Sequence, residues 1–367
     1  MKSRRIVIEC YPIATPFVGL GEFCRQIGER LGRRAAELKS RQGVELYFIV
    51  PPKFRGCFGS EVHYICMPGV FRNLLPWYPM PADLFHVPYQ YGRVKRMRHA
   101  QKQLLTVHDI NFIYETKGKK LKRAVRKFRR KINLADYVSY ISRFACEDTE
   151  KHFHVTLPKR VIYNGVTDLS AMADAASLPV NLPDRFLLHI SSLRAKKNVH
   201  LLVEMMDYLP EQNLLIAGNW EGSYGKMLQQ KIAQSKFGNI YMLPNVTESE
   251  KAALYAACRA FLFPSLCEGF GLPPIEAMKL GKPVFLSTLT SLPEIGGRAA
   301  FYWDDLVPES MADVLRKQLE LFDSNPSYVG ELKQNASRFD WDECVEHYIE
   351  YYLDIINRGR VDDGLNR

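Results

Sequence analysis

Short apolar runs alternate with longer amphipathic stretches along most of this chain. The runs with the length and composition of buried strands are 4–10, 46–50, 62–67, 84–88, 102–110, 137–142, 160–166, 185–192, 213–218, 240–243, 261–263, 283–287 and 299–304. A long helix is predicted after residue 21 by four apolar residues that fall on one face, Phe23, Ile27, Leu31 and Leu38. This alternation of strand and helix predicts an α/β protein with parallel sheets.

The alternation is interrupted once, near the middle of the chain. A length of 367 residues is long for a single core and fits two domains. The segment 167–183 is rich in small residues, contains prolines and carries little charge, and the strand pattern restarts after it. We therefore expect one domain in residues 1–170, a second in 171–340, and an aromatic-rich final helix within 341–367.

The stretch 261–297, FLFPSLCEGFGLPPIEAMKLGKPVFLSTLTSLPEIGG, is the most informative part of the sequence. A buried strand is followed by a glycine-containing loop, a helix and a second strand, which is the order of a βαβ unit. Proline is favoured in a first helical turn, so the helix is expected to start near Pro273 or Pro274.

The chemistry of this stretch follows from its loop. The backbone amides of Phe270, Gly271 and Leu272 are expected to point out of the helix N-terminus, which suits a diphosphate. Glu268 and Glu276 flank that site, and two carboxylates would repel a phosphate unless they bind another group. Sugar hydroxyls are the natural partners of such carboxylates. Taken singly, each glutamate also fits an ordinary solvated residue.

Glu268, seven intervening residues and Glu276, set in EGFGLPPIEAM, resemble the E-x7-E motif of retaining glycosyltransferases with the GT-B fold, most closely those of family 4. The downstream SLPEIGG matches the same family. The resemblance covers the second half of the chain well and the first half loosely. It implies an α/β GT-B fold of two Rossmann-like domains facing across a cleft, with the final helix crossing back to the first domain.

The resemblance also assigns roles to residues of the second half. Glu268 would orient the donor sugar, and Glu276 would bind the ribose. The loop LRAKKN resembles the family loop that holds the donor diphosphate, with Lys197 matching the family lysine. Many members have arginine where this chain has Ser192, and Arg194 would partly substitute for it. The backbone near Val246 would face the nucleotide base.

In the first half the resemblance is weaker. Gly19 and Gly21 lie in a loop where family members carry a glycine pair that lets a substrate approach the backbone, but Val18 occupies one of those positions. A tight turn before a helix explains the same glycines equally well. His108 ends a predicted strand, where ligands of open α/β sheets bind, and the family has a histidine there close to the donor sugar. A structural histidine is the alternative.

Charge is unevenly distributed between the two halves. The net charge is +10, but the first 170 residues have a balance of +17 and the remainder a balance of −7. Residues 117–131 hold ten Lys and Arg, no acid, and apolar residues at helical spacing, which predicts a basic amphipathic helix. We interpret it as contacting an anionic membrane surface, with a merely solvated face as the alternative. Nucleic acid is not expected as a partner, because no other nucleic-acid-binding pattern accompanies the basic run.

Metal and cofactor signals are weak in this sequence. Asp340-Trp-Asp342 is a D-x-D pattern, but it precedes a predicted helix, so capping is the simpler interpretation. No C-x-x-C pair, HExxH or dinucleotide fingerprint occurs, and we expect neither a catalytic metal nor a cofactor. The eight cysteines are expected to be reduced thiols, and the N-terminus runs into a strand rather than a secretory signal, which predicts a cytoplasmic protein peripheral to the inner face of the membrane.

The resemblance and the residues together predict a retaining, metal-independent hexosyltransferase. Its donor would be a GDP- or UDP-sugar carrying mannose or another hexose, and its acceptor a glycan or a lipid-linked glycan of cell-surface polysaccharide or lipopolysaccharide synthesis. Two alternatives remain open at this point. A GT-B-fold sugar-nucleotide epimerase would share the fold without an acceptor, and a non-enzymatic basic scaffold would leave the paired glutamates without a role.

Overall fold

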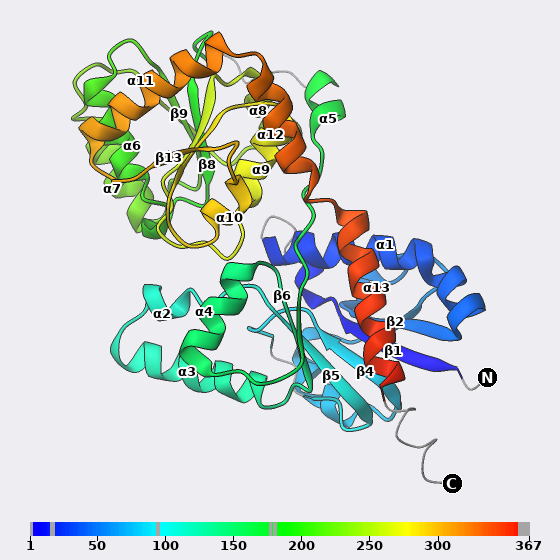
Figure 1. The fold of residues 1–367 in the computed structure, drawn as a ribbon. Coiled ribbons are helices and arrows are strands. Elements are labelled where there is room, and N and C mark those ends of the chain that lie inside the picture. Colours follow the sequence, from blue (N-terminus) through cyan, green and yellow to red (C-terminus); the bar gives the residue numbers. More distant parts are fainter. Residues whose placement is uncertain (1–2, 15–18, 93–95, 176–177, 179–181, 359–367) are drawn as a thin grey trace. The chain divides into compact units, whose positions relative to one another are not determined.

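The computed structural model describes the chain except for residues 1–2, 15–18, 93–95, 176–177, 179–181 and 359–367. It divides into two compact units, each built on its own parallel sheet (Figure 1). The first comprises Met1–Gly165 together with Asp340–Arg367, and the second Val166–Phe339. These boundaries lie within a few residues of the positions 170/171 and 340/341 expected from the sequence.

The sheet of the first unit has the strand order β3-β2-β1-β4-β5-β6-β7, and all its pairs are parallel. Its strands are β1 (Arg4–Glu9), β2 (Val44–Val50), β3 (His63–Cys66), β4 (Ala82–Val87), β5 (Ala100–Val107), β6 (Tyr137–Tyr140) and β7 (Lys159–Val161). The order reverses between β1 and β4, which makes the carboxyl ends of these strands the expected ligand-binding edge.

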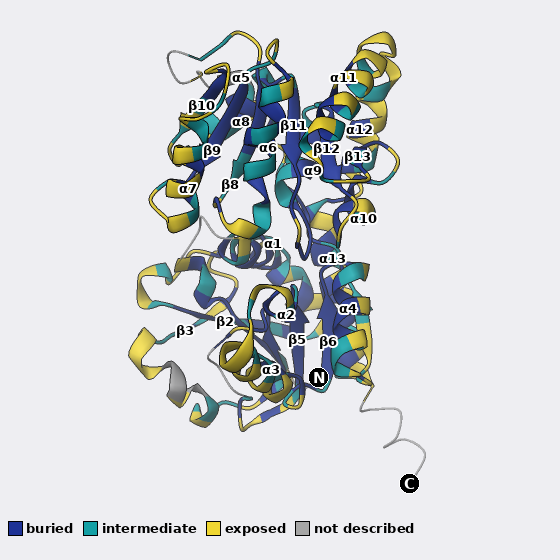
Figure 2. Ribbon diagram, turned by 90° about the vertical axis from the view of Figure 1, so that its left-hand side faces the viewer, coloured by how far each residue is buried: buried dark blue, intermediate teal, exposed yellow. Residues whose placement is uncertain are grey.

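Helices cover both faces of this first sheet. On one face lie α1 (Gly19–Gln42) and α13 (Trp341–Asn357), which contact each other and cross in Figure 1. The four apolar residues predicted to share one face of α1 are all buried in that core, which confirms the pattern: Phe23, Ile27, Leu31 and Leu38. On the other face lie α2 (Phe112–Glu115), α3 (Gly118–Ile132) and α4 (Arg143–Phe153), and the outward side of α3 is exposed in Figure 2.

Helix α13 is joined to the first sheet by a buried polar network as well as by apolar packing. The ring of His86 on β4 bonds to the Tyr352 hydroxyl through Nδ1 at 2.7 Å and to the Thr106 hydroxyl through Nε2 at 2.8 Å. Thr106 in turn contacts Ser139 at 2.7 Å and Tyr348 at 3.2 Å. Since these groups lie in an apolar core, each needs its partner, and the network fixes the helix on the sheet.

The second unit has a six-stranded parallel sheet of order β10-β9-β8-β11-β12-β13. Its strands are β8 (Leu187–Ser191), β9 (Leu214–Gly218), β10 (Ile240–Leu243), β11 (Ala260–Phe263), β12 (Val284–Ser287) and β13 (Phe301–Trp303). The helices of this unit are α5 (Ser170–Ala175), α6 (Val199–Met205), α7 (Ser223–Ile232), α8 (Glu248–Ala257), α9 (Leu272–Lys279), α10 (Leu292–Gly296), α11 (Pro308–Ser324) and α12 (Ser327–Ser337). The shared core is aliphatic and aromatic, and β9, β11 and β12 are buried along their length.

Two local predictions have clear outcomes. The interpretation of Asp340 as a helix cap is confirmed, because its carboxylate accepts the amides of Asp342 at 2.7 Å and Glu343 at 3.1 Å. The strand predicted at 160–166 is shorter than expected and ends at Val161. The chain beyond it runs against the start of α13, where a side chain at Gly165 would lie 2.3 Å from the Trp341 backbone nitrogen.

The eight cysteines all fall within the described residues, and none forms a disulfide. None of the helices in the described ranges combines the length and apolar character needed to span a bilayer.

Three buried histidines predict how stability depends on pH. Burial lowers the pKa of His86 to about 3 and the pKa values of His108 and His189 to about 4, from an ordinary value of 6.5. Between pH 6.5 and 4 the unfolded chain therefore binds more protons than the folded one, and stability falls as the pH falls. We expect each histidine to contribute on the order of 1 kcal/mol per pH unit to this loss.

Urea unfolding at pH 7.5, 6 and 5 measures the effect. The His189→Gln variant separates it from carboxylate titration, because its free energy of unfolding should depend on pH less steeply than that of the wild type. Identical pH dependence in the two proteins would contradict the prediction.

Candidate functional site

The loops that follow β8 and β11 are bonded to each other at the carboxyl edge of the second sheet. The amide of Leu266 donates to the carbonyl of Lys196 at 2.8 Å, and the Ser265 hydroxyl oxygen lies 3.1 Å from the same carbonyl oxygen. The β8 loop has a strained backbone, with φ of +44° at Leu193 and +57° at Asn198. Left-handed conformations of such residues are costly and tend to cluster at functional sites.

A buried ion pair joins the two loops. Lys197 Nζ lies 2.6 Å from Glu268 Oε1, and each side chain is only 12% exposed. The Ser265 hydroxyl donates to the same carboxylate oxygen, and the ammonium lies 4.7 Å from the centre of the Phe263 ring. The structure thus brings together two residues that the sequence had assigned separately to the diphosphate and to the sugar.

His189 on β8 holds the β8 loop through hydrogen bonds. This residue was not identified as a site residue from the sequence. Its Nδ1 lies 2.8 Å from the Leu262 carbonyl, and its Nε2 lies 2.8 Å from the Ser191 hydroxyl. A carbonyl only accepts, so Nδ1 carries the proton and Nε2 accepts from Ser191. Ser191 also accepts the amide of Leu193 at 3.2 Å, which holds the strained loop in place.

The segment between Glu268 and α9 is hydrogen-bonded to the loop after β12. The Glu268 amide donates to the Thr290 hydroxyl at 3.1 Å, and the Ser291 hydroxyl donates to the Phe270 carbonyl at 2.6 Å. Gly271 has φ of +129°, and a side chain there would lie 2.7 Å from the Ile295 side chain, so only glycine fits. Helix α9 begins at Leu272, close to the start expected from its prolines.

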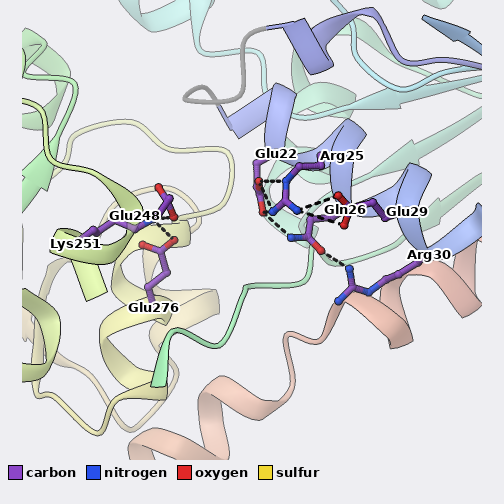
Figure 3. Close-up of polar contacts among 8 residues, drawn as sticks. All are labelled: Glu22, Arg25, Gln26, Glu29, Arg30, Glu248, Lys251 and Glu276. Carbon is purple, nitrogen blue, oxygen red and sulfur yellow. Dashed lines mark hydrogen bonds and ion pairs between the residues drawn. The ribbon is translucent and has the colours of Figure 1, made fainter. Parts of the chain in front are cut away.

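Glu276 is held by a second lysine and a tyrosine, both on α8. Its Oε1 lies 3.0 Å from Lys251 Nζ, and its Oε2 accepts from the Tyr255 hydroxyl at 2.9 Å. Figure 3 shows that Lys251 also contacts Glu248, at 2.9 Å. Burial alone would lower the pKa of Lys251, but the two carboxylates outweigh it and raise that pKa. Sequence reasoning missed both α8 residues, although their spacing of four places them on one helical face.

The other residues predicted in the second unit occupy less constrained positions. Arg194 is exposed in the β8 loop, and its side chain makes no hydrogen bond or ion pair within the described part of the chain. Ser192 is also exposed. Val246 is half-buried in the loop between β10 and α8. Among the described residues, no group of three or more His, Cys, Asp or Glu is arranged to hold a metal ion.

His108, Gly19 and Gly21 belong to the first unit. His108 follows β5 directly and is buried, with Nε2 2.8 Å from the Pro88 carbonyl, so this nitrogen carries the proton. The centres of the His108 and Phe23 rings lie 4.9 Å apart in an edge-to-face arrangement. Gly19 begins α1 and Gly21 is buried in its first turn, so the three predicted positions are gathered at the start of one helix. Val18 lies outside the described residues.

A polar cluster follows on the exposed side of α1. Glu22 accepts from Arg25 and from Gln26, each at 2.7 Å, and Arg25 also pairs with Glu29 at 3.1 Å (Figure 3). Arg30 bonds to Gln26 and pairs with Asp342 at 2.9 Å, which ties α1 to α13. Beyond helical spacing, no pattern in the sequence marks this cluster.

The chain is similar to known proteins both in sequence and in fold. Residues 172–338, most of the second unit, match the family described as Glycosyl transferases group 1. The chain is similar to O-antigen chain mannosyltransferase B of Escherichia coli, with 24% identity over 386 residues that cover 95% of this chain and 99% of that protein. It is also similar to the serotype-specific mannosyltransferase WbdA of Escherichia coli, with 29% identity over 204 residues. That match covers 50% of this chain and 23% of WbdA.

Solved structures share the architecture. Sucrose-phosphate synthase from Thermosynechococcus elongatus has a TM-score of 0.72 at 18% identity, covering 97% of this chain and 100% of that one. HepE from Anabaena, solved in complex with UDP-glucose, has a TM-score of 0.68 at 17% identity, covering 95% and 99%. These likenesses show the GT-B fold, with two Rossmann-like α/β domains. Together with the family match, they support a glycosyltransferase.

The buried pair of Lys197 and Glu268 makes a prediction about stability. Lys197→Met should cost about 3 kcal/mol, because it leaves a carboxylate buried without its cation. Adding Glu268→Gln should recover part of that loss, so a double-mutant cycle should give a coupling free energy above about 1 kcal/mol.

Urea unfolding of the four proteins measures this coupling. Arg316 and Glu211 are the matched control, because they lie 3.1 Å apart with side chains 42% and 46% exposed. Their coupling should stay below about 1 kcal/mol. Equal coupling for the two pairs would contradict the interpretation of Lys197 and Glu268 as a buried pair.

Proposed function

We propose that this protein is a retaining glycosyltransferase. It would transfer mannose or another hexose from a GDP- or UDP-sugar to a glycan or lipid-linked acceptor in cell-surface polysaccharide or lipopolysaccharide synthesis. The observation that carries the proposal is the pairing of Glu268 and Glu276 with buried lysines on either side of the α9 N-terminus. The match to a glycosyltransferase family and the similarity to mannosyltransferases support it.

Electrostatics explains how these residues would act on the donor. Negative charge grows on the nucleoside diphosphate as the glycosidic bond breaks, and cations and amides already aimed at it stabilise that charge. The cations would be the side chains of Lys197 and Arg194. The amides would be the backbone N–H groups of Phe270, Gly271 and Leu272. The ammonium of Lys197 has three protons, so it can keep Glu268 as one partner while it binds a phosphate oxygen.

The two glutamates would position the donor rather than attack it. Glu268, already oriented by Lys197 and Ser265, would accept hydroxyls of the sugar. Glu276, oriented by Lys251 and Tyr255, would accept the ribose hydroxyls. The neutral His108 would contact the sugar near the reacting carbon. No protein nucleophile is assigned, and the leaving phosphate would accept the proton of the acceptor hydroxyl on the same face, which retains the configuration.

The two alternatives make different demands on these residues. An epimerase would convert the donor to its epimer without an acceptor and without net release of nucleotide, and a scaffold would leave the donor unchanged. Measuring nucleotide release and the configuration of the remaining donor, with and without a lipid-linked acceptor, separates all three hypotheses. A thermal-shift screen of UDP-, GDP- and ADP-sugars identifies the base, since a bound ligand raises the apparent stability.

Replacement of either glutamate should cut transfer sharply. We expect Glu268→Ala and Glu276→Ala each to lower kcat/KM on the order of 100-fold, because positioned polar contacts are lost at the reacting donor. Glu248→Ala is the control. Glu248 contacts Lys251, which is also the partner of Glu276, but the Glu248 side chain is 61% exposed. Circular dichroism checks that each variant is folded. Near-normal transfer by both glutamate variants would refute the glycosyltransferase proposal.

Transfer should also survive EDTA. Every group proposed to hold the diphosphate is a lysine, an arginine or a backbone amide, and none needs a metal ion to bind phosphate. Initial rates measured before and after chelation should agree within about twofold. A large loss of activity that Mg²⁺ or Mn²⁺ restores would contradict a metal-free mechanism.

The basic helix α3 supports association with the inner face of the cell membrane. Eight of its cations are exposed, and none of them forms an ion pair within the described part of the chain: Lys119, Lys120, Lys122, Arg123, Arg126, Lys127, Arg129 and Arg130. Its apolar residues Phe128 and Ile132 face the core. An unpaired cationic surface of this kind is attracted to anionic headgroups by roughly 1 kcal/mol per basic residue near the bilayer.

The protein should therefore sediment with anionic vesicles, bind neutral vesicles poorly and be released by salt. The Debye length shrinks from about 10 Å at 0.1 M to about 3 Å at 1 M salt, which screens the attraction. Exchange of six α3 cations for glutamine should abolish binding without lowering donor affinity: Lys122, Arg123, Arg126, Lys127, Arg129 and Arg130.

A control variant removes exposed cations from elsewhere in the first unit: Arg33, Lys39, Arg41, Lys53 and Arg55. It should bind almost as well as the wild type. The membrane role is wrong if the α3 variant sediments like the wild type, or if the wild type ignores anionic vesicles at low salt.

A further inference from the structure

A short segment between β3 and β4 presents large apolar side chains to solvent. The 3-10 helix η3 (Gly69–Trp77) contains Val70, Phe71, Leu74 and Trp77, which are 80%, 52%, 57% and 65% exposed. A 3-10 helix has three residues per turn, so Phe71, Leu74 and Trp77 form one stripe along it. Contiguous exposed apolar side chains of this kind mark an interaction surface. We refer to these four residues as the apolar stripe.

The apolar stripe is held in place by contacts at both of its ends. At its start, the Phe71 amide donates to the Pro68 carbonyl at 3.0 Å. At its end, the amide of Arg98 donates to the Pro76 carbonyl at 2.9 Å, and its guanidinium lies 5.3 Å from the centre of the Trp77 ring. Just beyond η3, Tyr78 and Met80 pack against the core of the first unit. The outward direction of the stripe is therefore fixed by the chain on either side of it.

The apolar stripe and α3 belong to the same face of the first sheet. Residues flanking η3 and residues of α3 pack against one core, which includes Met67 and Tyr78 from the former and Phe128 and Ile132 from the latter. The two elements are also connected through the segment before β5. Arg98 contacts η3, and Arg96, two residues earlier, bonds to Asp136 at 3.0 Å, just beyond the end of α3.

We propose that the apolar stripe inserts at the headgroup boundary of an anionic bilayer and acts as a second anchor beside α3. The inference rests on the membrane association proposed for α3. The charge of the surroundings favours a lipid surface over a protein partner, because eight exposed cations of α3, which packs against the same core, form no ion pair within the described residues. Tryptophan beside an arginine suits the boundary itself, where an amphipathic ring meets both acyl chains and headgroups.

We expect neither the α3 cations nor the apolar stripe to hold the protein at the membrane alone. A single short apolar anchor gives marginal, reversible binding, and stable attachment takes an apolar group together with a basic patch. The α3 cations would gather the protein at the surface, and the stripe would slow its release. Salt should still detach the protein, since the stripe alone is too weak to hold it.

Tryptophan fluorescence tests insertion directly. Of the four tryptophans, Trp303 and Trp341 are 1% and 2% exposed, Trp220 is half-buried in the second unit, and Trp77 is 65% exposed. Vesicles of phosphatidylserine and phosphatidylcholine should shift the emission to the blue, and brominated acyl chains should quench it. Trp77→Phe should remove both effects.

Sedimentation tests the affinity. The triple variant Val70→Ser, Phe71→Ser, Leu74→Ser should bind these vesicles at low salt but about tenfold or more weakly at near-physiological ionic strength, where the cations alone are screened. The matched control changes exposed apolar residues of the second unit to serine: Val307, Leu321 and Val329. It should bind like the wild type.

Three outcomes would overturn the proposal. Unshifted Trp77 emission in vesicle-bound protein, or wild-type affinity of the triple variant, would mean that the stripe stays outside the bilayer while α3 binding stands. Self-association lost in the triple variant, with vesicle binding unchanged, would make the stripe a contact between copies. Absence of vesicle binding at low salt would refute both anchors. Nucleotide release from the donor is measured separately, so none of these results decides the transferase proposal.

Discussion

A carboxylate buried beside a cation is the interaction on which the second unit's site depends. Glu268 is almost fully covered, and removing a charge from water is costly unless an opposite charge lies against it. Lys197 supplies that charge from another loop, which forces the β8 and β11 loops to stay together. The strained backbone at Leu193 and Asn198 is tolerated because the pair and the Ser191 contact hold it. The site is thus rigid before any substrate arrives.

The two units differ in how their charged and polar groups are arranged. At the edge of the second sheet, Glu276 pairs with Lys251 and Glu268 with Lys197. The first unit has a polar network in its core that includes His86 and Tyr352, and it exposes a large unpaired positive charge on α3. Paired charges fix the positions of side chains, whereas unpaired charges attract oppositely charged partners over long distances. The paired charges and the unpaired cationic surface therefore lie on separate sheets of one chain.

Much of the architecture could be predicted from the sequence, because strand and helix periodicity are local signals. The amphipathic face of α1, the start of α9 and the extent of α3 all followed from spacing. Partners distant in sequence could not be predicted. Glu268 and Glu276 are marked by a motif, but Tyr255 and His189 reach the site only through packing, and neither has a local pattern that distinguishes it from core. The exposed stripe at η3 was not anticipated from the sequence either, because the exposure of an apolar side chain is set by what packs on it.

The return of α13 to the first unit sets an order in which the chain can acquire its structure during synthesis. The contact between His86 and Tyr352 spans 266 positions, and the whole second unit is translated between them. On a ribosome the second unit can therefore close while one face of the first sheet still lacks its last helix. That face is lined by apolar strand residues such as Ile8, Leu84 and Leu104. A nascent chain halted before α13 would present this uncovered surface to chaperones, and the first unit matures last although it is made first.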